Sequence, residues 1–286
     1  MSKTLDHRLY AYREDLADIR LEGLVTAERY AEGAPGEVIV PVADIRPRPD
    51  PGCSIDTQAL LGEALRIFDI SGGWAWVQLA ADGYVGYVRE EAIRQGSTSA
   101  THVVSVPRSF VYPGADLRFP HSRVLSMGSR VRIVGDAETR GTPYALLEDG
   151  SAIIATHLRP VGEAAAEDAV SVASRFLETP YLWGGRTGFG IDCSGLVQMA
   201  LAMTGKSAPR DSDQQAAGLG AVIEPQSDGL QRGDLVFWKG HVGFLEDPDT
   251  LLHASGGTMT VTREPLQAAI DRIARLYGLP TIYRRP

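Results

Sequence analysis

The feature that most constrains this chain is a glycine-rich loop that leads into a helix-like run, TPYLWGGRTGFGIDCSGLVQMALAMTG, which contains Cys193. Apolar residues recur at helical spacing after the cysteine, and Asp192 is a suitable N-cap, so we predict a helix that begins at Cys193. A thiol in the first turn of a helix lies near unpaired backbone N–H groups, which lowers its pKa and favours the thiolate. The glycines at 184, 185, 188 and 190 would let the backbone come close to a bound molecule. These features favour a nucleophilic cysteine.

A nucleophilic cysteine needs a base, usually a histidine oriented by a third polar group. His241 opens the strand-like run HVGFLED, and His253 ends the run TLLH. Antiparallel neighbouring strands of this length would bring both side chains to one end of a sheet. The order cysteine, histidine, polar third residue matches the papain-type arrangement. A zinc site at Cys193, His241 and His253 is the alternative chemistry, but the sequence has no close-spaced pair of metal ligands such as HExxH or CxxC.

The chain is long enough for several domains, and its pattern changes along its length. Residues 1–36 are charged and weakly periodic, and we expect an arm that wraps the body. Residues 37–97 and 101–161 look like two copies of one small β unit, each with alternating strands and Gly-containing turns, such as Gly72-Gly73. An Ala-rich run predicts a helix that ends before Pro180, and strands follow, so residues 164–286 read as an α+β domain.

Charge and N-terminal composition limit the partners and the location. The net charge is −8 with a pI near 5.3, which argues against nucleic acid or an anionic membrane as the main partner. Charged residues such as Asp6, Arg8 and Arg13 interrupt any apolar core of a secretory signal, and no segment is apolar enough to cross a membrane. We expect a cytoplasmic protein in which Cys53 and Cys193 stay reduced, with Cys53 as a loop residue.

Three segments in this order resemble the NlpC/P60 family of cell-wall cysteine peptidases: YLWGG…DCSGLVQ, RGDLVFW…HVGFL and LLHASG. The resemblance covers about residues 164–286. The two β units resemble the SH3-like modules that precede this domain in one subgroup, γ-D-glutamyl-L-diamino acid endopeptidases that recycle muropeptides. The resemblance therefore implies two small SH3-like β-barrels followed by an α+β, papain-like catalytic domain.

The same resemblance implies the site residues. Cys193 would be the nucleophile, His241 the base and His253 the orienting residue, and Tyr181 would polarise the scissile carbonyl beside the Cys193 backbone N–H. The subgroup requires a free N-terminal L-Ala on its substrate, whose ammonium needs acidic partners. The positions that match its substrate-binding residues are Asp192, Ser194, Asp211, Ser212, Tyr84 (with Tyr87 as second choice) and Glu63. No metal or cofactor is implied, and we expect a monomer.

Structural alternatives stand beside several of these roles. Asp211 followed by Gln214 resembles a capping box, so Asp211 could be a helix N-cap, with or without a substrate contact. Tyr84 could belong to a β-barrel core, and Glu63 could be an exposed acid at a strand edge. The rival functions are a secreted peptidoglycan DL-endopeptidase and a non-catalytic module that binds peptidoglycan.

Overall fold

The computed structural model describes residues 5–286, which form two compact units. The first unit contains the residues up to Val161 apart from two short loops, and the second contains those loops, 105–108 and 126–128, with all residues from Gly162 on. No helix within residues 5–286 has the length and hydropathy that spanning a bilayer demands.

The first β module, residues 34–95, is built around a long hairpin. Its elements, in chain order, are β3 (Ala34–Val38), β4 (Val42–Ile45), β5 (Thr57–Leu60), β6 (Ala64–Ser71), β7 (Trp74–Leu79), β8 (Val85–Arg89), the 3-10 turn η2 (Glu90–Ala92) and β9 (Ile93–Gln95). One sheet has the order β8-β7-β6-β3-β9, and β4 pairs with β5. Gly72 and Gly73, both with positive φ, connect β6 to β7, which confirms the predicted turn. Strand β3 begins at Ala34, slightly before the boundary expected at residue 37.

The N-terminal segment packs against this module within the first unit. It contains the parallel pair β1 (Leu16–Asp18) and β2 (Arg29–Ala31), joined by the 3-10 turn η1 (Ile19–Leu21). Leu16 is fully buried in a cluster with Phe68 and Trp76 of the module. The guanidinium of Arg13 lies 4.4 Å from the Trp76 ring centroid. Apolar burial and this cation–π contact account for the ordering of a segment with little regular structure.

The second β module, residues 102–160, repeats the order of elements in the first. Its elements are β10 (His102–Val104), β11 (Arg108–Tyr112), β12 (Arg123–Ser126), β13 (Arg130–Val131), β14 (Ile133–Thr139), β15 (Thr142–Leu147), β16 (Ala152–Ile154), the 3-10 turn η3 (Ala155–His157) and β17 (Leu158–Pro160). In both modules a 3-10 turn precedes a last strand that pairs with the first, β9 with β3 and β17 with β10. The number of SH3-like domains and the closure of each barrel remain predictions.

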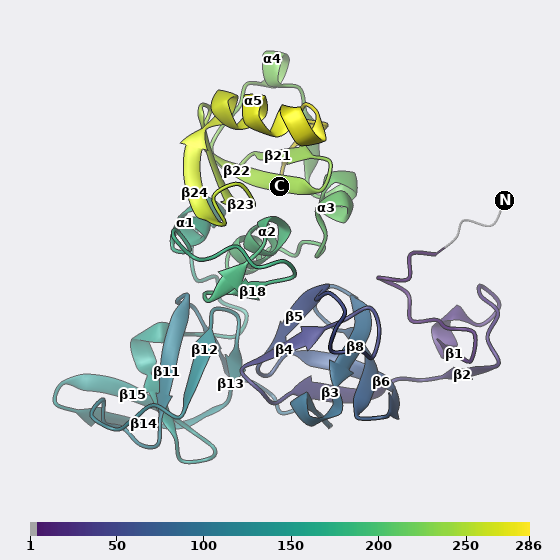
Figure 1. Cartoon of the computed structure of the whole chain (residues 1–286). Helices are drawn as coiled ribbons and strands as arrows, with labels where there is room; N and C mark the ends of the chain where they lie inside the picture. The colour runs from purple at the N-terminus through teal and green to yellow at the C-terminus, as the bar shows by residue number, and fades with distance from the viewer. Residues whose placement is uncertain (1–4) are drawn as a thin grey trace. The chain divides into compact units, whose positions relative to one another are not determined.

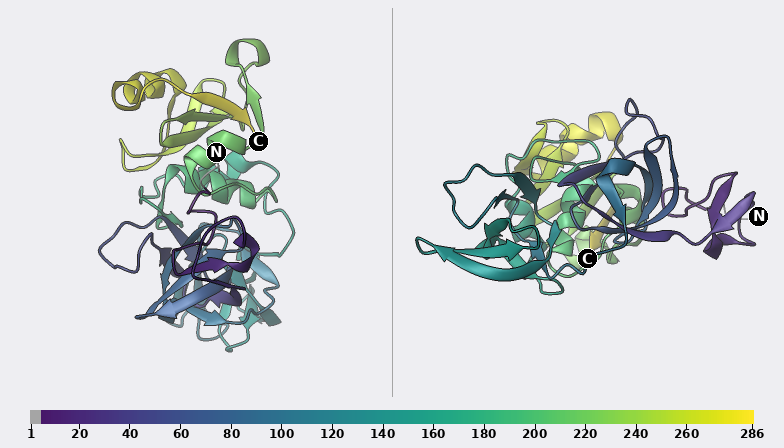
Figure 2. Two further views of the ribbon diagram at one scale, coloured as in Figure 1. Left: turned by 90° about the vertical axis from the view of Figure 1, so that its right-hand side faces the viewer. Right: turned by 90° about the horizontal axis from the view of Figure 1, so that it is seen from below.

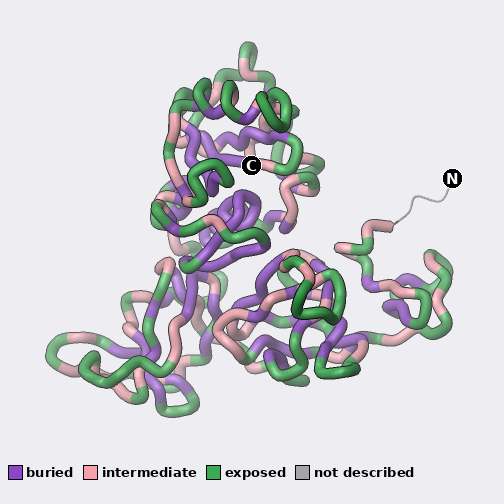
Figure 3. Tube along the Cα trace, in the orientation of Figure 1, coloured by how far each residue is buried: buried purple, intermediate pink, exposed green. Residues whose placement is uncertain are grey.

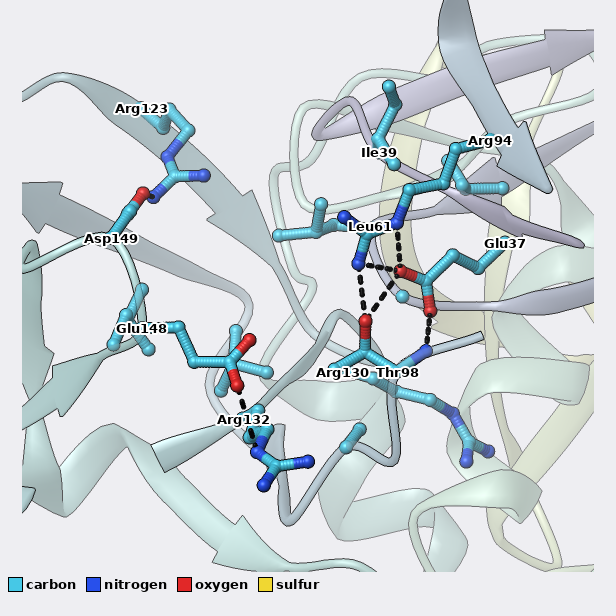
Figure 4. A pocket seen from close by; sticks show the side chains of 15 residues that line it. Glu37, Ile39, Leu61, Arg94, Thr98, Arg123, Arg130, Arg132, Glu148 and Asp149 are labelled. Carbon is cyan, nitrogen blue, oxygen red and sulfur yellow. Dashed lines mark hydrogen bonds and ion pairs between the residues drawn. The ribbon is translucent and has the colours of Figure 1, made fainter. Parts of the chain in front are cut away.

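A pocket of about 220 Å³ lies between the two modules inside the first unit (Figure 4). Glu37 accepts hydrogen bonds there from Arg94 Nε at 2.7 Å and from the backbone N–H of Thr98 at 2.6 Å. The remaining acids are also paired, Asp149 with Arg123 and Glu148 with Arg132. These ion pairs neutralise much of the charge that lines the pocket.

The second unit combines helices with a six-stranded antiparallel sheet and a separate two-stranded pair. Its strands are β18 (Arg186–Thr187), β19 (Gly190–Ile191), β20 (Ala221–Ile223), β21 (Leu235–Trp238), β22 (His241–Asp247), β23 (Thr250–Ser255), β24 (Thr260–Pro265) and β25 (Ile282–Arg285). The sheet has the order β20-β25-β21-β22-β23-β24, and β18 pairs only with β19. Its helices are α1 (Ala169–Ser174), α2 (Cys193–Ala202), α3 (Ser212–Gly218), α4 (Pro225–Asp228) and α5 (Leu266–Tyr277).

Helices cover both faces of this sheet. Helix α5 lies over one face, while α2, with α1 beside it, packs against β22 and β23 from the other face (Figure 1; Figure 2, left). The α5 face buries Leu266, Ala269 and Ile273 against the strands. Helix α2 is buried on all sides from Cys193 to Leu201, and the burial is visible along its trace (Figure 3). The predicted Ala-rich helix is shorter than expected, because α1 ends at Ser174.

Gly62 offers a test of how closely the two modules pack. Its φ is +75°, and an added Cβ would lie 2.5 Å from the carbonyl oxygen of Arg130. Gly72 also has a positive φ, but nothing lies within 4 Å of its added Cβ. We expect Gly72→Ala to cost about 1–2 kcal/mol through backbone strain alone, and Gly62→Ala to cost clearly more. Thermal unfolding of both variants checks this, and equal losses would show that the close approach is unimportant.

Candidate active site

The carboxylate of Asp192 organises the start of α2. Its Oδ1 accepts a hydrogen bond from the backbone N–H of Gly195 at 2.7 Å, which confirms the predicted N-cap. Its Oδ2 accepts from the backbone N–H of Gly184 at 2.9 Å. One side chain therefore ties the glycine-rich loop to the first turn of the helix that carries Cys193.

Arg210 completes this arrangement, and the sequence did not point to it. Its guanidinium is 1% exposed and donates to both oxygens of Asp192, at 3.0 and 2.6 Å. It also donates to the hydroxyl of Ser194 at 2.9 Å. This bidentate, desolvated ion pair is the strong form of an arginine–carboxylate contact. The predicted substrate-binding residues Asp192 and Ser194 thus lie together beneath the loop, and their contact with substrate stays a prediction.

The glycines of the loop serve the packing of the loop itself. An added Cβ at Gly185 would lie 2.6 Å from the carbonyl oxygen of Gly190, and one at Gly190 would lie 2.7 Å from Cβ of Leu182. The strands β18 and β19 fold back on each other in this space. The expectation that these glycines admit a ligand is replaced, at these two positions, by a close approach of backbone to neighbouring residues.

Cys193 lies 5% exposed in the first turn of α2. Burial, and after it the negative charge of Asp192, raises the pKa of its thiol to about 12, although hydrogen bonds from the Val242 and Ser194 backbone and the charge of Arg210 act in the opposite direction. The predicted lowering of this pKa by the helix start is therefore wrong. Desolvation of the thiolate outweighs the favourable field of the N–H groups.

The two predicted histidines meet at the end of the sheet near Cys193. Val242, whose backbone hydrogen bonds to the thiol, directly follows His241 in β22. Strands β22 and β23 are antiparallel, and His241 Nε2 lies 2.7 Å from His253 Nδ1. This confirms the expected meeting of the two side chains. Burial, followed by the neighbouring His253 and Arg272, lowers the pKa of His241 to about 3, so the imidazole is neutral at physiological pH.

Two further residues extend this arrangement beyond the predicted set. Glu264 Oε1 of β24 lies 2.8 Å from His253 Nε2 and also receives a hydrogen bond from Arg272 of α5. The hydrogen bond from His253, together with Arg272, holds the pKa of Glu264 below its ordinary value despite partial burial. The signal that could find Glu264 is strand register, because it lies two residues beyond Thr262, the partner of His253 in β24.

Tyr181 lies on the loop side of Cys193. It forms a bridge with Ile191, two residues before the cysteine, and its backbone N–H donates to the carbonyl of Met259 at 2.8 Å. Burial, and then the charges of Cys193 and Asp192, raise the pKa of its phenol. The hydroxyl therefore stays protonated and able to donate a hydrogen bond near the thiol.

Asp211 and Ser212 lie at the start of α3. Asp211 is the N-cap and forms a capping box with Gln214, whose Oε1 accepts from the Asp211 backbone N–H at 3.4 Å. This confirms the capping role that the sequence left open. Gln215 of the same helix is fully buried and donates to the carbonyl oxygen of Ser194 at 3.0 Å, which links α3 to the first turn of α2. Binding of substrate by Asp211 and Ser212 stays a prediction.

Tyr84 and Glu63 belong to the first unit. Tyr84 is 3% exposed and packs in the hydrophobic core of the first β module. Glu63 is also buried, and its Oε2 accepts from the backbone N–H of Leu60 at 3.0 Å. Tyr87, the second choice for the substrate-binding tyrosine, is half-buried, and its hydroxyl accepts a hydrogen bond from an Arg13 guanidinium nitrogen at 3.2 Å. The core role left open for Tyr84 thus describes what it does within the module. The expectation of an exposed acid is wrong for Glu63, because its carboxylate is buried in the turn between β5 and β6, where it accepts the Leu60 N–H. The substrate roles of these residues stay predictions.

The arrangement around Cys193 supplies a thiol, a neutral imidazole and a hydrogen-bond donor in a buried setting. Within residues 5–286 no group of three His, Cys, Asp or Glu side chains could hold a metal ion. A thiol with a raised pKa can attack a carbonyl when a neighbouring base removes its proton during the attack. The geometry therefore fits nucleophilic chemistry with the proton transferred inside the site.

Loss of the buried Asp192–Arg210 ion pair should lower the free energy of unfolding. Arg210→Met leaves the Asp192 charge buried without its partner, and we expect a loss of about 3–5 kcal/mol. The matched control is Arg263→Met, which breaks the surface pair with Glu246 and should cost less than about 1 kcal/mol. Denaturant unfolding measures both. Similar losses for the two variants would contradict a structural role for the buried pair.

The raised pKa of the Cys193 thiol should determine how fast the thiol is alkylated at each pH. Because a raised pKa favours the neutral thiol, alkylation by iodoacetamide should be slow near neutral pH and should rise by about tenfold per pH unit, with no plateau below about pH 10. The measurement uses a Cys53→Ser background, so that only Cys193 reacts. Fast alkylation that is independent of pH between about pH 5 and about pH 7 would instead reveal a preformed thiolate–imidazolium pair.

Family models match two parts of the chain. The model described as bacterial dipeptidyl-peptidase Sh3 domain matches residues 45–93, in the first β module. The model described as NlpC/P60 family matches residues 178–272, which contain Cys193, His241 and His253. The two matches fall on different units, in the order that the sequence analysis expected.

Curated relatives and solved structures agree with these matches. The γ-D-glutamyl-L-lysine dipeptidyl-peptidase of Bacillus cereus is 26% identical over 239 residues, which are 74% of this chain and 71% of the relative. A crystal structure of an NlpC/P60 family protein from Bacillus cereus aligns with a TM-score of 0.72 at 22% identity, over 88% of this chain and 99% of that one, and so shares its fold. The probable endopeptidase NlpC of Escherichia coli is 33% identical over 114 residues, 35% of this chain and 72% of that protein. The chain belongs to the NlpC/P60 family and is a peptidase.

Proposed function

We propose that this peptidase hydrolyses the amide bond between γ-D-glutamate and the following diamino acid in muropeptides with a free N-terminal L-Ala, as a step in the recycling of cell-wall peptides in the cytoplasm. The observation that carries the proposed chemistry is the buried Cys193 beside the His241–His253 pair. The substrate class is supported by the Bacillus cereus relative, whose name gives a γ-D-glutamyl-L-lysine bond and the release of a dipeptide. Release of a dipeptide requires that the substrate has a free N-terminus close to the cleaved bond.

The proposed reaction has two stages. His241 takes the proton of the Cys193 thiol as the sulfur attacks the γ-carbonyl carbon, and the Tyr181 hydroxyl and the Cys193 backbone N–H donate to the developing oxyanion. His241 then protonates the leaving amine of the diamino acid as the C–N bond breaks. A water molecule, deprotonated by His241, finally cleaves the thioester and releases L-Ala-D-Glu.

Two forms of the diamino acid enter the test of the substrate. The relative's name specifies L-lysine, whereas the family resemblance implies meso-diaminopimelate. The two differ by a carboxylate on the side chain, which an arginine would recognise bidentately. Comparison of kcat/KM for the two peptides assigns the preference.

Cleavage of defined peptides tests the proposal. We expect wild-type protein to cleave L-Ala-γ-D-Glu-meso-diaminopimelate or the lysine peptide with EDTA present, and Cys193→Ala to lower kcat by more than about 10³-fold. N-acetylation of L-Ala should abolish cleavage, because the blocked amine loses its charge. Mass spectrometry identifies the products, and Cys53→Ala is the matched control.

The other outcomes separate the rival functions. Equal cleavage of free and acetylated peptide would support a general peptidoglycan endopeptidase and would remove the proposed substrate roles of Tyr84, Glu63 and Asp211. Absence of cleavage, with binding of the peptide retained, would support a non-catalytic binding module.

A further inference from the structure

A series of hydrogen bonds through four side chains connects the proposed base, His241, to helix α5. His241 Nε2 contacts His253 Nδ1 at 2.7 Å, and His253 Nε2 contacts Glu264 Oε1 at 2.8 Å. Arg272 donates to that same carboxylate oxygen. Three neighbouring strands and α5 supply one residue each, so packing of regular elements fixes their spacing.

We propose that Glu264 is a positioning residue of this peptidase: its carboxylate determines which nitrogen of each histidine carries the proton, and so leaves Nδ1 of His241 free to accept the proton of Cys193. The proposal rests on the proposed roles of Cys193 as nucleophile and His241 as base. It adds a residue to the site that acts on the reaction only through His253.

The direction of the proton chain follows from what each group can donate. An ionised carboxylate only accepts hydrogen bonds, so His253 Nε2, its partner, must carry a hydrogen. The proposal takes His253 as a neutral imidazole, which has one such hydrogen, so its Nδ1 is an acceptor. His241 Nε2 must then be the donor in the 2.7 Å contact, and the lone pair of His241 remains on Nδ1.

The opposite placement of the hydrogens on the two histidines would leave the heavy atoms where they are and would leave no base for Cys193. If Glu264 did not demand a hydrogen from Nε2, His253 could carry its proton on Nδ1 and donate to His241. The hydrogen of His241 would then lie on Nδ1, the nitrogen needed as the base. Loss of the carboxylate should therefore reduce catalysis without moving the backbone or the rings.

Burial strengthens the control that Glu264 exerts. His253 is 1% exposed, so water does not compete for either of its nitrogens. The centroid of the Trp238 ring lies 5.7 Å from that of His241. In such a low-dielectric setting an unsatisfied hydrogen bond is costly, so one proton arrangement dominates.

Arg272 favours the charge state that this hydrogen-bonded series requires, with Glu264 ionised and His241 neutral. Its positive charge helps to hold the carboxylate of Glu264 ionised and opposes a second proton on His241. The other titratable groups at the pair are the Cys193 thiol from α2 and, beside it, the Tyr181 phenol and the Asp192–Arg210 ion pair. Removal of Arg272 should raise the pKa values of Glu264 and His241, so the acid limb of the pH profile should move to higher pH.

The experiment combines kinetics with a measurement that needs no substrate. Full-length protein labelled with ¹⁵N-histidine is examined by two-bond ¹H–¹⁵N correlation near neutral pH, as wild type and as Glu264→Leu, which removes the acceptor that a glutamine oxygen would keep. We expect the wild type to show the Nε2–H form at both His241 and His253, and the variant to lose this pattern. On the cleaved peptide, kcat of Glu264→Leu should fall roughly 10²- to 10⁴-fold with KM within about threefold.

Controls separate positioning from folding. Glu246→Leu removes another carboxylate of the same sheet that is paired with an arginine, Arg263, and should leave kcat within about twofold. Arg272→Gln should shift the acid limb upward while the protein stays folded. An unchanged tautomer pattern in Glu264→Leu, or a kcat within about threefold of wild type, would overturn the proposal. If wild type cleaves neither peptide, the proposed function fails, and the tautomer pattern alone decides the role of Glu264.

Discussion

The buried ion pair between Asp192 and Arg210 is the interaction on which the rest of the site depends. Through it one carboxylate holds the glycine-rich loop at Gly184, the first turn of α2 at Gly195 and the chain segment before α3. The same contact has a chemical consequence, because the negative charge of Asp192 raises the pKa of the Cys193 thiol. The scaffold that positions the nucleophile therefore also keeps it protonated at rest, and a base must remove the proton during the attack.

The proposed base stands on paired strands of the second unit that are packed between helices. His241 and His253 project from adjacent strands that are buried between α2 on one side and α5 on the other. Groups held on strands keep their geometry better than groups on loops, which suits a proton transfer over a single hydrogen bond. Glu264 and Arg272 are held in the same way, because they lie on β24 and α5, the regular elements next to β23.

Local signals in the sequence predicted much of this site. The cap at Asp192, the helix from Cys193, the Gly72-Gly73 turn and the meeting of the two histidines follow from short-range patterns, and the structure confirms them. Arg210 and Glu264 did not follow, because their roles depend on partners that only tertiary packing or exact strand register brings near. The raised pKa of the Cys193 thiol did not follow from the sequence either, because a sequence shows the position of a residue in a helix but not its full burial. Knowledge of the family supplied the substrate class, which no local pattern contains.

The measurement that tests the central claim most directly is capture of the acyl-enzyme. Wild-type protein is mixed with L-Ala-γ-D-Glu-diamino acid peptide, quenched in acid within milliseconds and analysed by intact mass and peptide mapping. The account predicts a mass increase equal to an L-Ala-γ-D-glutamyl group, located on Cys193 and absent from Cys193→Ala. Cleavage by Cys193→Ala at the wild-type rate, or an acyl group mapped to another residue, would contradict it.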